Sequence, residues 1–503
     1  MANEHLKHIV IVGGGTAGWM TAATLSQAFH GKLCKITLIE SEEIGIIGVG
    51  EATIPPIRQF NSINGIDEVE FVRQTQATFK LGIEFVDWAR KGHTYMHPFG
   101  FYGKPIDLIS FHHYWLRLRQ LGDATPLQDY SLPIAAAYQN KFVVAQNDPD
   151  SVFGGYAYAF HFDAGLYARF LRDHCEKRGV TRVEGRITGV NLNGEDGYID
   201  SVTLASGEIV SGDLFVDCSG FRALLMGEAM GVGYDDWSSF LPCNRATVAP
   251  CERVSPLTPY TRATAHSAGW QFRIPIQSRT GNGHIFSADF MNEDHATQIL
   301  LDNLDGKPLG TPRTIRFTTG KRKTMWHKNC VAIGLSAGFL EPLESTSIHL
   351  TQKAAARLVG FLPTHRYDTV SRDEFNRLMD NEYIEVRDFL VLHYKATSRD
   401  DSEFWNYCRT MPIPDTLQRR IDLFKARGRI LSFADELFGE ASYLAVMTGQ
   451  DIMPDHYDPL VDVLDADDIR GRLDRMRKII SDTVVRMPSQ AEFIDRTCKA
   501  QPA

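Results

Sequence analysis

The sequence predicts an α/β fold with an inserted β-sheet, followed by a mostly helical C-terminal region. Near the N-terminus, an apolar strand leads into a glycine-rich turn and a helical pattern. The middle of the chain has further apolar strands that end in small residues, a pattern typical of a sheet covered by helices. From about residue 366 the sequence becomes charged and helix-favouring, without further strand–helix–strand patterns. We therefore divide the chain into an α/β part, 1–365, and a helical part, 366–503.

Length and composition indicate a globular protein that is large enough to enclose a cofactor. The 503 residues exceed what one hydrophobic core usually supports, so we expect one large domain or two interlocked domains. The net charge of −9 and the lack of a dense Lys/Arg block argue against nucleic acid as a partner. The N-terminal stretch MANEHLKHIVIVGGG has no signal-peptide pattern, and no apolar run is long enough to span a membrane. The eight cysteines form no CxxC pair, so we expect a cytoplasmic protein without a metal centre.

A dinucleotide-binding fingerprint follows the first strand. The predicted strand His8–Val12 leads into a GxGxxG turn and a helical pattern, and the next strand, KITLIE, ends at Glu40. In such a turn Gly13 permits the tight bend, Gly15 lets the backbone approach a pyrophosphate, and Gly18 allows close helix packing. Glu40 would hold the adenosine ribose, although a glycine-rich turn without a ligand is the alternative. Because only one fingerprint occurs, the sequence favours a single FAD that is reduced from outside.

The middle of the chain repeats strands that end in small residues. The stretch SVTLASGEIVSGDLFVDCSGF predicts a hairpin with its turn near Ser206–Gly207, then a strand Leu214–Asp217. The stretch HKNCVAIGLSAGF predicts another apolar strand that runs into Gly334. This order resembles the glutathione-reductase-like flavoproteins, in which such turns bring backbone against a flavin. Many of those proteins carry Asp after the last glycine, whereas Leu335 stands here.

One short stretch, GFLEPLESTSIHL, concentrates polar groups in an apolar setting. The pattern after it predicts a helix whose N-cap is the hydroxyl residue Ser345 or Thr346. The free N–H groups at that helix start would suit an anion or an electron-rich edge of a flavin. Glu341 and Glu344 stand just ahead of it. Taken alone, the two glutamates indicate only a helix start.

Seven motifs occur in the order found in flavin-dependent tryptophan halogenases, which the chain resembles from the first glycine motif to roughly residue 460. They are GVGEATIPP, TFKLGIEF, HYWLRLR, HFDAGLYARFLRD, DLFVDCSGFRALL, GWQFRIP and EPLESTSIHL. In that family the pattern WxWxIP separates halogenases from flavin monooxygenases. Here Trp270 is present and Phe272 replaces the second Trp, which keeps a large apolar side chain.

The resemblance implies a mechanism. Externally reduced FAD reacts with oxygen to a hydroperoxide, which halide attacks to give hypohalous acid, and this oxidant moves through a tunnel to Lys80. Without the motif, Lys80 would read as an exposed surface lysine. Glu344 would position the halogenating species and accept the proton, and Thr346 and Ser347 would form the halide pocket for chloride or bromide. The family usually has Gly where Ser347 stands, which would alter the size of the pocket.

The resemblance also implies cofactor contacts and partners. The FAD contacts would be Gly13, Gly15, Thr16, Ala17, Gly18, Glu40, Gly50, Glu51, Ile187, Gly334, Leu335 and Ile348. A separate NADH-dependent flavin reductase would supply FADH2, and a homodimer is left open. Residues 1–365 would form the FAD, halide and catalytic module, with substrate-covering segments near 80–160, and 366–503 would form the substrate-binding region.

The substrate residues point away from free tryptophan. His97 and Phe99 match aromatic positions that flank the indole in tryptophan-accepting relatives, although HPF alone could be a simple turn before a strand. Phe438 falls where those relatives have another aromatic wall, while Ala426 and Arg427 fall where a tyrosine pair grips the carboxylate. A site without partners for an ammonium and a carboxylate favours a neutral indole or another electron-rich arene, free or carrier-bound.

Two other functions remain open from the sequence. An aromatic flavin monooxygenase would use the same FAD fold without Lys80 or halide. Phe272 and Ser347, which depart from the halogenase pattern, are compatible with this alternative. A non-catalytic flavin-binding protein would need neither TFKLG nor EPLES. The presence of both motifs favours the halogenase.

Overall fold

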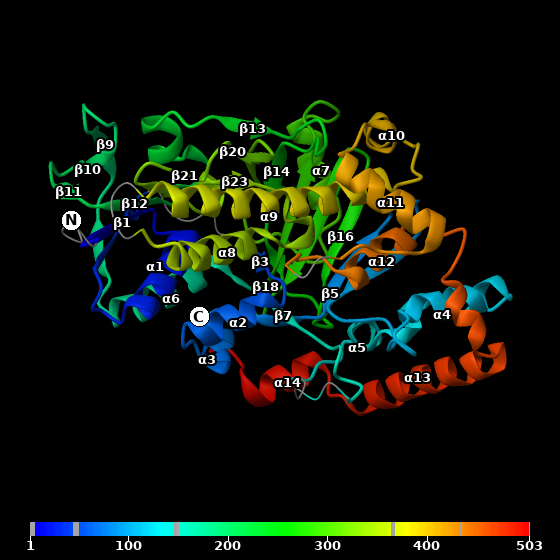
Figure 1. Ribbon diagram of the computed structural model, residues 1–503. Coiled ribbons are helices and arrows are strands. Elements are labelled where there is room, and N and C mark those ends of the chain that lie inside the picture. The colour runs from blue at the N-terminus through cyan, green and yellow to red at the C-terminus, as the bar shows by residue number, and fades with distance from the viewer. Residues whose placement is uncertain are drawn as a thin grey trace. The chain divides into compact units, whose positions relative to one another are not determined.

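The computed structural model describes residues 6–43, 50–144, 148, 150–363, 368–432 and 435–501 (Figure 1). Its contacts divide the chain into two compact units. Unit 1 comprises Met1–Gln76, Phe162–Asn244 and Arg316–Ile384. Unit 2 comprises Ala77–His161, Arg245–Ile315 and Glu385–Ala503. The predicted division at 365 concerns the roles of the segments and stays a prediction.

Unit 1 is built around a sheet in the order β21-β22-β12-β1-β2-β8. β1 (His8–Val12) lies in the middle and pairs in parallel with β2 (Lys35–Glu40) and β12 (Leu214–Asp217), at the predicted positions. The other strands are β8 (Thr181–Glu184), β21 (Trp326–His327) and β22 (Cys330–Ala332). The sequence HIVIV is apolar almost throughout because a sheet covered on both faces buries successive side chains.

Helix α1 (Thr16–Phe29) contacts α6 (Ala164–Glu176) and α8 (Ser347–Gly360). Its small residues let these helices pack closely, so most of α1 is buried. The other helical segments of unit 1 are α2 (Pro56–Ile63), α3 (Glu68–Gln74), η2 (Gly220–Arg222), η3 (Leu224–Ala229), η4 (Gly334–Ser336) and η5 (Pro342–Glu344).

Shorter strands complete unit 1. β9 (Ile187–Leu192), β10 (Ile199–Leu204) and β11 (Ile209–Ser211) form a small antiparallel sheet, which confirms the predicted hairpin turn. The others are β3 (Gly50–Ala52), β13 (Tyr234–Asp236), β20 (Gly320–Arg322) and β23 (Gly338–Phe339).

Unit 2 contains the inserted sheet, in the order β19-β14-β18-β17-β16-β5-β6, with β15 paired to β18. β5 (Gly82–Val86) pairs in parallel with β16 (Thr261–His266) and antiparallel with β6 (Thr94–Pro98). The remaining strands of this sheet are β14 (Arg245–Val248), β15 (Cys251–Glu252), β17 (Gly269–Pro275), β18 (Arg279–Phe286) and β19 (Arg313–Arg316). Outside it, β4 (Thr78–Lys80) pairs with β7 (Ala159–Asp163).

The C-terminal region is helical, as predicted. α9 (Thr369–Lys395) leads into a series of helices, and the described residues after it form no strand. The helical segments of unit 2 are α4 (Phe111–Gln120), η1 (Leu127–Tyr130), α5 (Leu132–Tyr138), α7 (Glu293–Asp302), α10 (Glu403–Thr410), α11 (Asp415–Arg427), α12 (Glu440–Gly449), η6 (Pro459–Val463), α13 (Ala466–Arg486) and α14 (Gln490–Thr497). Among the described residues, no helix is long and apolar enough to cross a membrane.

Candidate functional site

The three fingerprint glycines have three different surroundings. Gly13 has φ +111°, and a Cβ there would lie 2.3 Å from the carbonyl oxygen of Cys218. A Cβ on Gly18 would lie 1.8 Å from the carbonyl oxygen of Gly13, so a side chain would disrupt the packing of α1. A Cβ on Gly15 would meet no atom within 4 Å. The turn is thus closed on the protein side and open at Gly15, just before Thr16 and Ala17 begin α1, as a pyrophosphate cradle requires.

Glu40 at the end of β2 is held by residues that the sequence analysis missed. Its carboxylate accepts a hydrogen bond from Arg182 Nε and lies 3.3 Å from Trp19 Nε1. A Cβ on Gly14 would collide with the same carboxylate, so Gly14 is also required. The run of three glycines was a signal for Gly14, whereas nothing local in the sequence links Arg182 to Glu40.

Two predicted flavin contacts are brought to this turn by β22 and η4. Gly334 has φ +77°, and a Cβ there would lie 2.6 Å from the Cβ of Ala17. Leu335 follows within η4. Gly185, two residues before Ile187, donates its N–H to the carbonyl of Glu40 at 2.8 Å. The turn, Gly334 and the chain near Ile187 therefore belong to one region of unit 1.

The motif GVGEATIPP is described only in part. Gly48 and Val49 lie outside the described residues, whereas Gly50 and Glu51 belong to β3. Burial raises the pKa of Glu51 to about 7, so this carboxyl is partly protonated at neutral pH. The residue is thus able to donate as well as accept a hydrogen bond.

The EPLESTS stretch is buried at its polar positions except Ser347, which is partly exposed. Glu341, Glu344 and Thr346 each expose none of their surface. Ser345 has φ +59°, and this left-handed residue turns the chain from η5 into α8. Buried carboxylates are costly, so the reading in which the glutamates serve only a helix start does not account for them.

Thr346 is the N-cap of α8, but its hydroxyl does not cap the helix. Its backbone is helical, with φ −90° and ψ −13°, instead of the extended conformation that aims a side chain at the N2 or N3 amide. Within the described part of the chain, the buried Oγ1 of Thr346 has no hydrogen-bond partner. The predicted N-cap position is therefore confirmed at Thr346, although its hydroxyl does not bond the helix amides. Thr346 Oγ1 and the amides around Ser347 and Ile348 are left to bind something else.

Lys80 is a buried lysine at the end of β4. Its side chain is fully buried, which corrects the reading of an isolated surface lysine. Its Nζ lies 5.1 Å from the ring centroid of Phe99, a cation–π distance. Burial, together with the charge of Lys80, holds the pKa of His161 well below its ordinary value, so His161 is neutral. A lysine in such surroundings is unusual in a purely structural role.

The three predicted substrate residues form one aromatic cluster in unit 2. The ring centroid of His97 lies 6.5 Å from that of Phe99 and 6.2 Å from that of Phe438. His97 belongs to β6, so the alternative of a simple turn is wrong. Phe389 of α9 stacks on Phe438 at 3.9 Å, a partner that sequence reasoning missed. Arg427 ends α11, immediately before a left-handed Gly428.

The WxWxIP position lies in β17. Trp270 and Phe272 are both buried, with ring centroids 6.2 Å apart. A Cβ on Gly283 of the neighbouring strand would lie 2.4 Å from Phe272 Cζ, so the ring already fills its space. The structure therefore groups Lys80 and the aromatic residues in unit 2, and the glycine turn and the EPLESTS residues in unit 1.

Comparisons with known proteins agree with these features. The family model for tryptophan halogenase matches residues 8–466. A flavin-dependent halogenase from Xanthomonas campestris, Xcc4156, is 45% identical, with 99% of this chain and 100% of that chain covered and a TM-score of 0.96. BrvH, a flavin-dependent halogenase from Brevundimonas sp. BAL3, is 47% identical over 98% and 99% of the two chains, with a TM-score of 0.94.

A third relative is the tryptophan 6-halogenase SttH of Streptomyces toxytricini, which is 33% identical over 98% of each chain. The family implies FAD and a halide ion, and the open glycine cradle and the buried hydroxyl of Thr346 fit these groups. The chain therefore belongs to the tryptophan halogenase family and is a flavin-dependent halogenase.

Proposed function

We propose that this enzyme halogenates a neutral indole or another electron-rich arene with hypohalous acid that is delivered to Lys80. The observation that carries the proposal is the burial of Lys80 in contact with Phe99, in the unit that also holds His97 and Phe438. A buried amine beside an aromatic cluster can act on a small oxidant without competition from bulk water. A separate NADH-dependent flavin reductase supplies the reduced cofactor.

Oxygen is the oxidant: bound reduced FAD would supply two electrons and the halide the other two, so that one oxygen atom ends in hypohalous acid and the other in water. The open face at Gly15 and the start of α1 bind its pyrophosphate, and Glu40 holds the adenosine ribose. Arg182 donates a hydrogen bond to the Glu40 carboxylate and holds it in place. Gly334 and Leu335 bring backbone against the flavin.

The halide binds at the start of α8. Backbone amides at Ser347 and Ile348, together with Thr346 Oγ1, supply donors at the positive end of the helix dipole. The Cβ and hydroxyl of Ser347 reduce the room that a glycine would leave. We therefore expect Ser347 to influence the preference between chloride and bromide.

Lys80 and Glu344 have different roles in the proposed reaction. The Lys80 amine hydrogen-bonds hypohalous acid or forms a haloamine, which places the electrophilic halogen near the arene. Glu344 helps to position that species and accepts the proton that the arene loses. The aromatic rings of His97, Phe99 and Phe438 hold the substrate plane. With Ala426 and Arg427 in place of a tyrosine pair, a neutral substrate is favoured over free tryptophan.

The decisive experiment is a product analysis. The enzyme is incubated with FAD, a flavin reductase, NADH, oxygen and indole, with chloride, bromide or no halide, and the products are identified by mass spectrometry. Lys80→Met, which keeps an unbranched apolar stem in the buried site, is expected to lower halogenated product by about 100-fold or more. The matched variant Lys307→Met, at an exposed lysine, is expected to retain wild-type yield.

Three outcomes would contradict the proposal. Hydroxylated indole that forms without halide and without Lys80 would assign a monooxygenase reaction instead. Halogenated product from Lys80→Met at the wild-type rate would remove Lys80 from the mechanism. Product from free tryptophan but none from indole would contradict the substrate class.

A further inference from the structure

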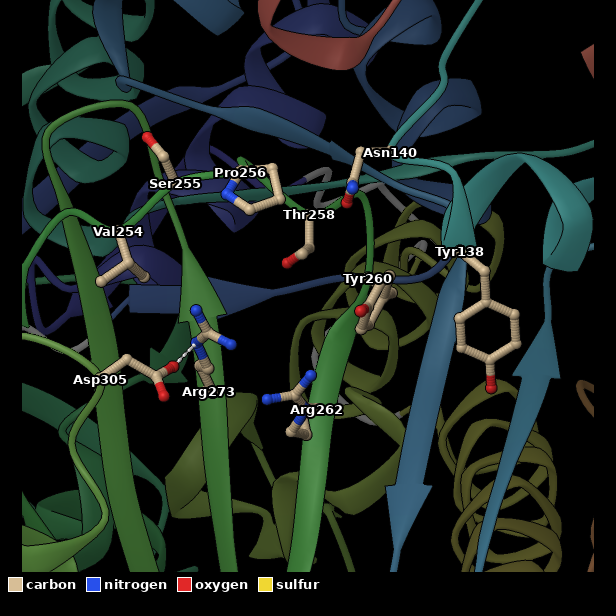
Figure 2. A pocket seen from close by; sticks show the side chains of 10 residues that line it. All are labelled: Tyr138, Asn140, Val254, Ser255, Pro256, Thr258, Tyr260, Arg262, Arg273 and Asp305. Carbon is tan, nitrogen blue, oxygen red and sulfur yellow. Dashed lines mark ion pairs between the residues drawn. The ribbon is translucent and has the colours of Figure 1, made fainter. Parts of the chain in front are cut away.

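A polar cavity of about 400 Å³ lies in unit 2, separate from the residues assigned to halogenation (Figure 2). It is lined by Tyr138, Asn140, Val254, Ser255, Pro256, Thr258, Tyr260, Arg262, Arg273 and Asp305. Lys80, His97, Phe99 and Phe438 are not among these lining residues. The volume lies in the range of small-molecule sites, and a single halide ion would leave most of it empty.

Two arginines stand directly opposite each other at the base of this cavity. Arg262 of β16 and Arg273 of β17 are cross-strand partners in the antiparallel pair, and Figure 2 shows their guanidinium groups beside each other. Like charges in this arrangement repel, which costs folding free energy. Burial lowers the pKa of Arg273, which reflects the cost of keeping this cation away from water. The two cations therefore need anionic partners nearby.

Each arginine already has a carboxylate partner. Glu84 accepts from Arg262 Nε at 2.6 Å, and Asp305 pairs with Arg273 Nε. Tyr260 also hydrogen-bonds Arg262. Both carboxylates contact the Nε edge of a guanidinium, and the formal charges of the two arginines and their two partners sum to zero. The cavity therefore offers an anion directional N–H and O–H donors, and not a net positive charge.

Neutral donors and an aromatic ring surround the arginines. The hydroxyls of Thr258 and Tyr260 and the amide of Asn140 line the same cavity. The rings of Tyr138 and Tyr260 are 6.2 Å apart with an edge-to-face geometry, so they form a corner that a flat group can contact. A guanidinium pair with flanking hydroxyls can donate to the several acceptor oxygens of a planar carboxylate or a tetrahedral phosphate.

We propose that this cavity binds a small organic oxyanion, a carboxylate or a phosphate monoester, whose oxygens bridge Arg262 and Arg273. The binding is non-covalent and independent of the halogenation chemistry. The organic part of the ligand lies along Tyr138 and Tyr260, which is why a cavity of this size is larger than the anion alone requires.

Isothermal titration calorimetry on the FAD-saturated enzyme at low ionic strength tests this proposal. Saturation with FAD removes the glycine turn as a competing phosphate site. The probes are inorganic phosphate, phenyl phosphate and benzoate, so the phosphate and carboxylate sources are separated. Phenyl phosphate is expected to bind more tightly than inorganic phosphate, because only the former reaches the tyrosines.

Variants locate the binding. Arg273→Gln is expected to lower the affinity for the tightest-binding probe at least tenfold. Arg262→Lys keeps the charge but loses the planar guanidinium, so it is expected to lower that affinity by less. Arg279→Gln is the matched control, because it removes one positive charge from β18 outside the lining residues. If Arg273→Gln fails to fold, Arg262→Lys and Tyr260→Phe carry the test.

Two kinds of binding result would overturn the proposal. If none of the three probes binds the wild-type enzyme, the cavity is not an oxyanion site. Binding that is unchanged in both arginine variants, or that falls equally in Arg279→Gln, places the anion elsewhere and also rejects the proposal. Neither outcome affects the halogenation assay with Lys80→Met, so the two proposals stand or fall separately.

Discussion

His349 and Glu382 form a buried pair, with 3.1 Å between His349 Nε2 and Glu382 Oε1. The other carboxylate oxygen accepts from Arg357 at 2.8 Å, and Lys353 Nζ lies 3.8 Å away. The three basic residues are four positions apart on α8, so they share the face that meets α9 (Figure 1). Although burial raises the pKa of Glu382, the hydrogen bond from His349 and the nearby positive charges outweigh it and lower the pKa overall. One carboxylate thus fixes the helix whose first turn begins at Ser347.

Glu382→Gln is expected to lower the free energy of unfolding by about 3 kcal/mol, because it leaves several basic groups without their buried counter-charge. Urea unfolding measures the change. The KM for halide should also rise, since the start of α8 loses its anchor. Glu374→Gln on the same helix is the control, because Glu374 pairs with Arg377 on the surface and its loss should leave the unfolding midpoint unchanged. Equal midpoints for both variants would show that Glu382 anchors nothing.

Gly15→Ala separates cofactor binding from folding. No protein atom lies within 4 Å of the added Cβ, so the thermal midpoint of the cofactor-free protein should stay the same. The methyl group would project into the space assigned to the pyrophosphate, and we expect FAD affinity to fall about tenfold, measured by flavin fluorescence. Gly13→Ala should instead destabilise the fold, because φ is +111° and the Cβ meets the Cys218 carbonyl. Unchanged FAD affinity in Gly15→Ala would move the pyrophosphate away from this turn.

The raised pKa of Glu51 predicts how the free energy of unfolding depends on pH. Its pKa in the folded protein is about 7, whereas the unfolded value is 4.5, so the folded state keeps a proton that the unfolded state releases above pH 4.5. The contribution of this proton to stability is complete below pH 4.5 and is lost as the pH rises through 7. Between pH 4.5 and 8 the wild type should lose on the order of 3 kcal/mol that Glu51→Gln does not lose, as measured by urea unfolding of the cofactor-free protein. If the free energies of unfolding of the wild type and Glu51→Gln depend on pH in the same way, the prediction is contradicted. Glu208→Gln, which removes an exposed carboxyl, is the control for the loss of one carboxylate.

The backbone of the FAD-binding part could be predicted because its signals are local. The apolar run His8–Val12, the glycines after it and the strand that ends at Glu40 each specify their own conformation within a few residues. The tight bend at Gly13 is local, whereas the atoms that exclude a side chain at Gly13 and Gly14 belong to Cys218 and Glu40. A strand–turn–helix unit is therefore readable from sequence without knowledge of its neighbours.

Side-chain partners from distant segments could not be predicted in this way. Arg182 meets Glu40 across 142 positions, and Phe389 of α9 stacks on Phe438, in the loop before α12, across 49 positions. The N-cap position at Thr346 could be predicted, whereas the helical backbone of Thr346, which follows a left-handed Ser345 and leaves the hydroxyl without a cap bond, could not. Packing, rather than propensity, decides these positions.

Phe438→Leu tests the aromatic cluster as a substrate site. Leucine keeps most of the apolar volume beside Phe389 but removes the π face that would stack on indole. Losing about 1 kcal/mol of stacking corresponds to a rise of about fivefold in the KM for indole. The rate at which the enzyme oxidises FADH2 without substrate should not change, because the flavin residues belong to unit 1.

The same substitution elsewhere provides the comparison. Phe404→Leu alters a buried ring that packs on Phe290 and Trp405, outside the cluster, so it carries a similar stability cost without a predicted effect on KM. If both variants raise the KM for indole equally, the effect reflects general loosening of unit 2. If only Phe438→Leu does so, the ring at 438 contacts the substrate, because a difference between matched variants cancels the contribution from folding.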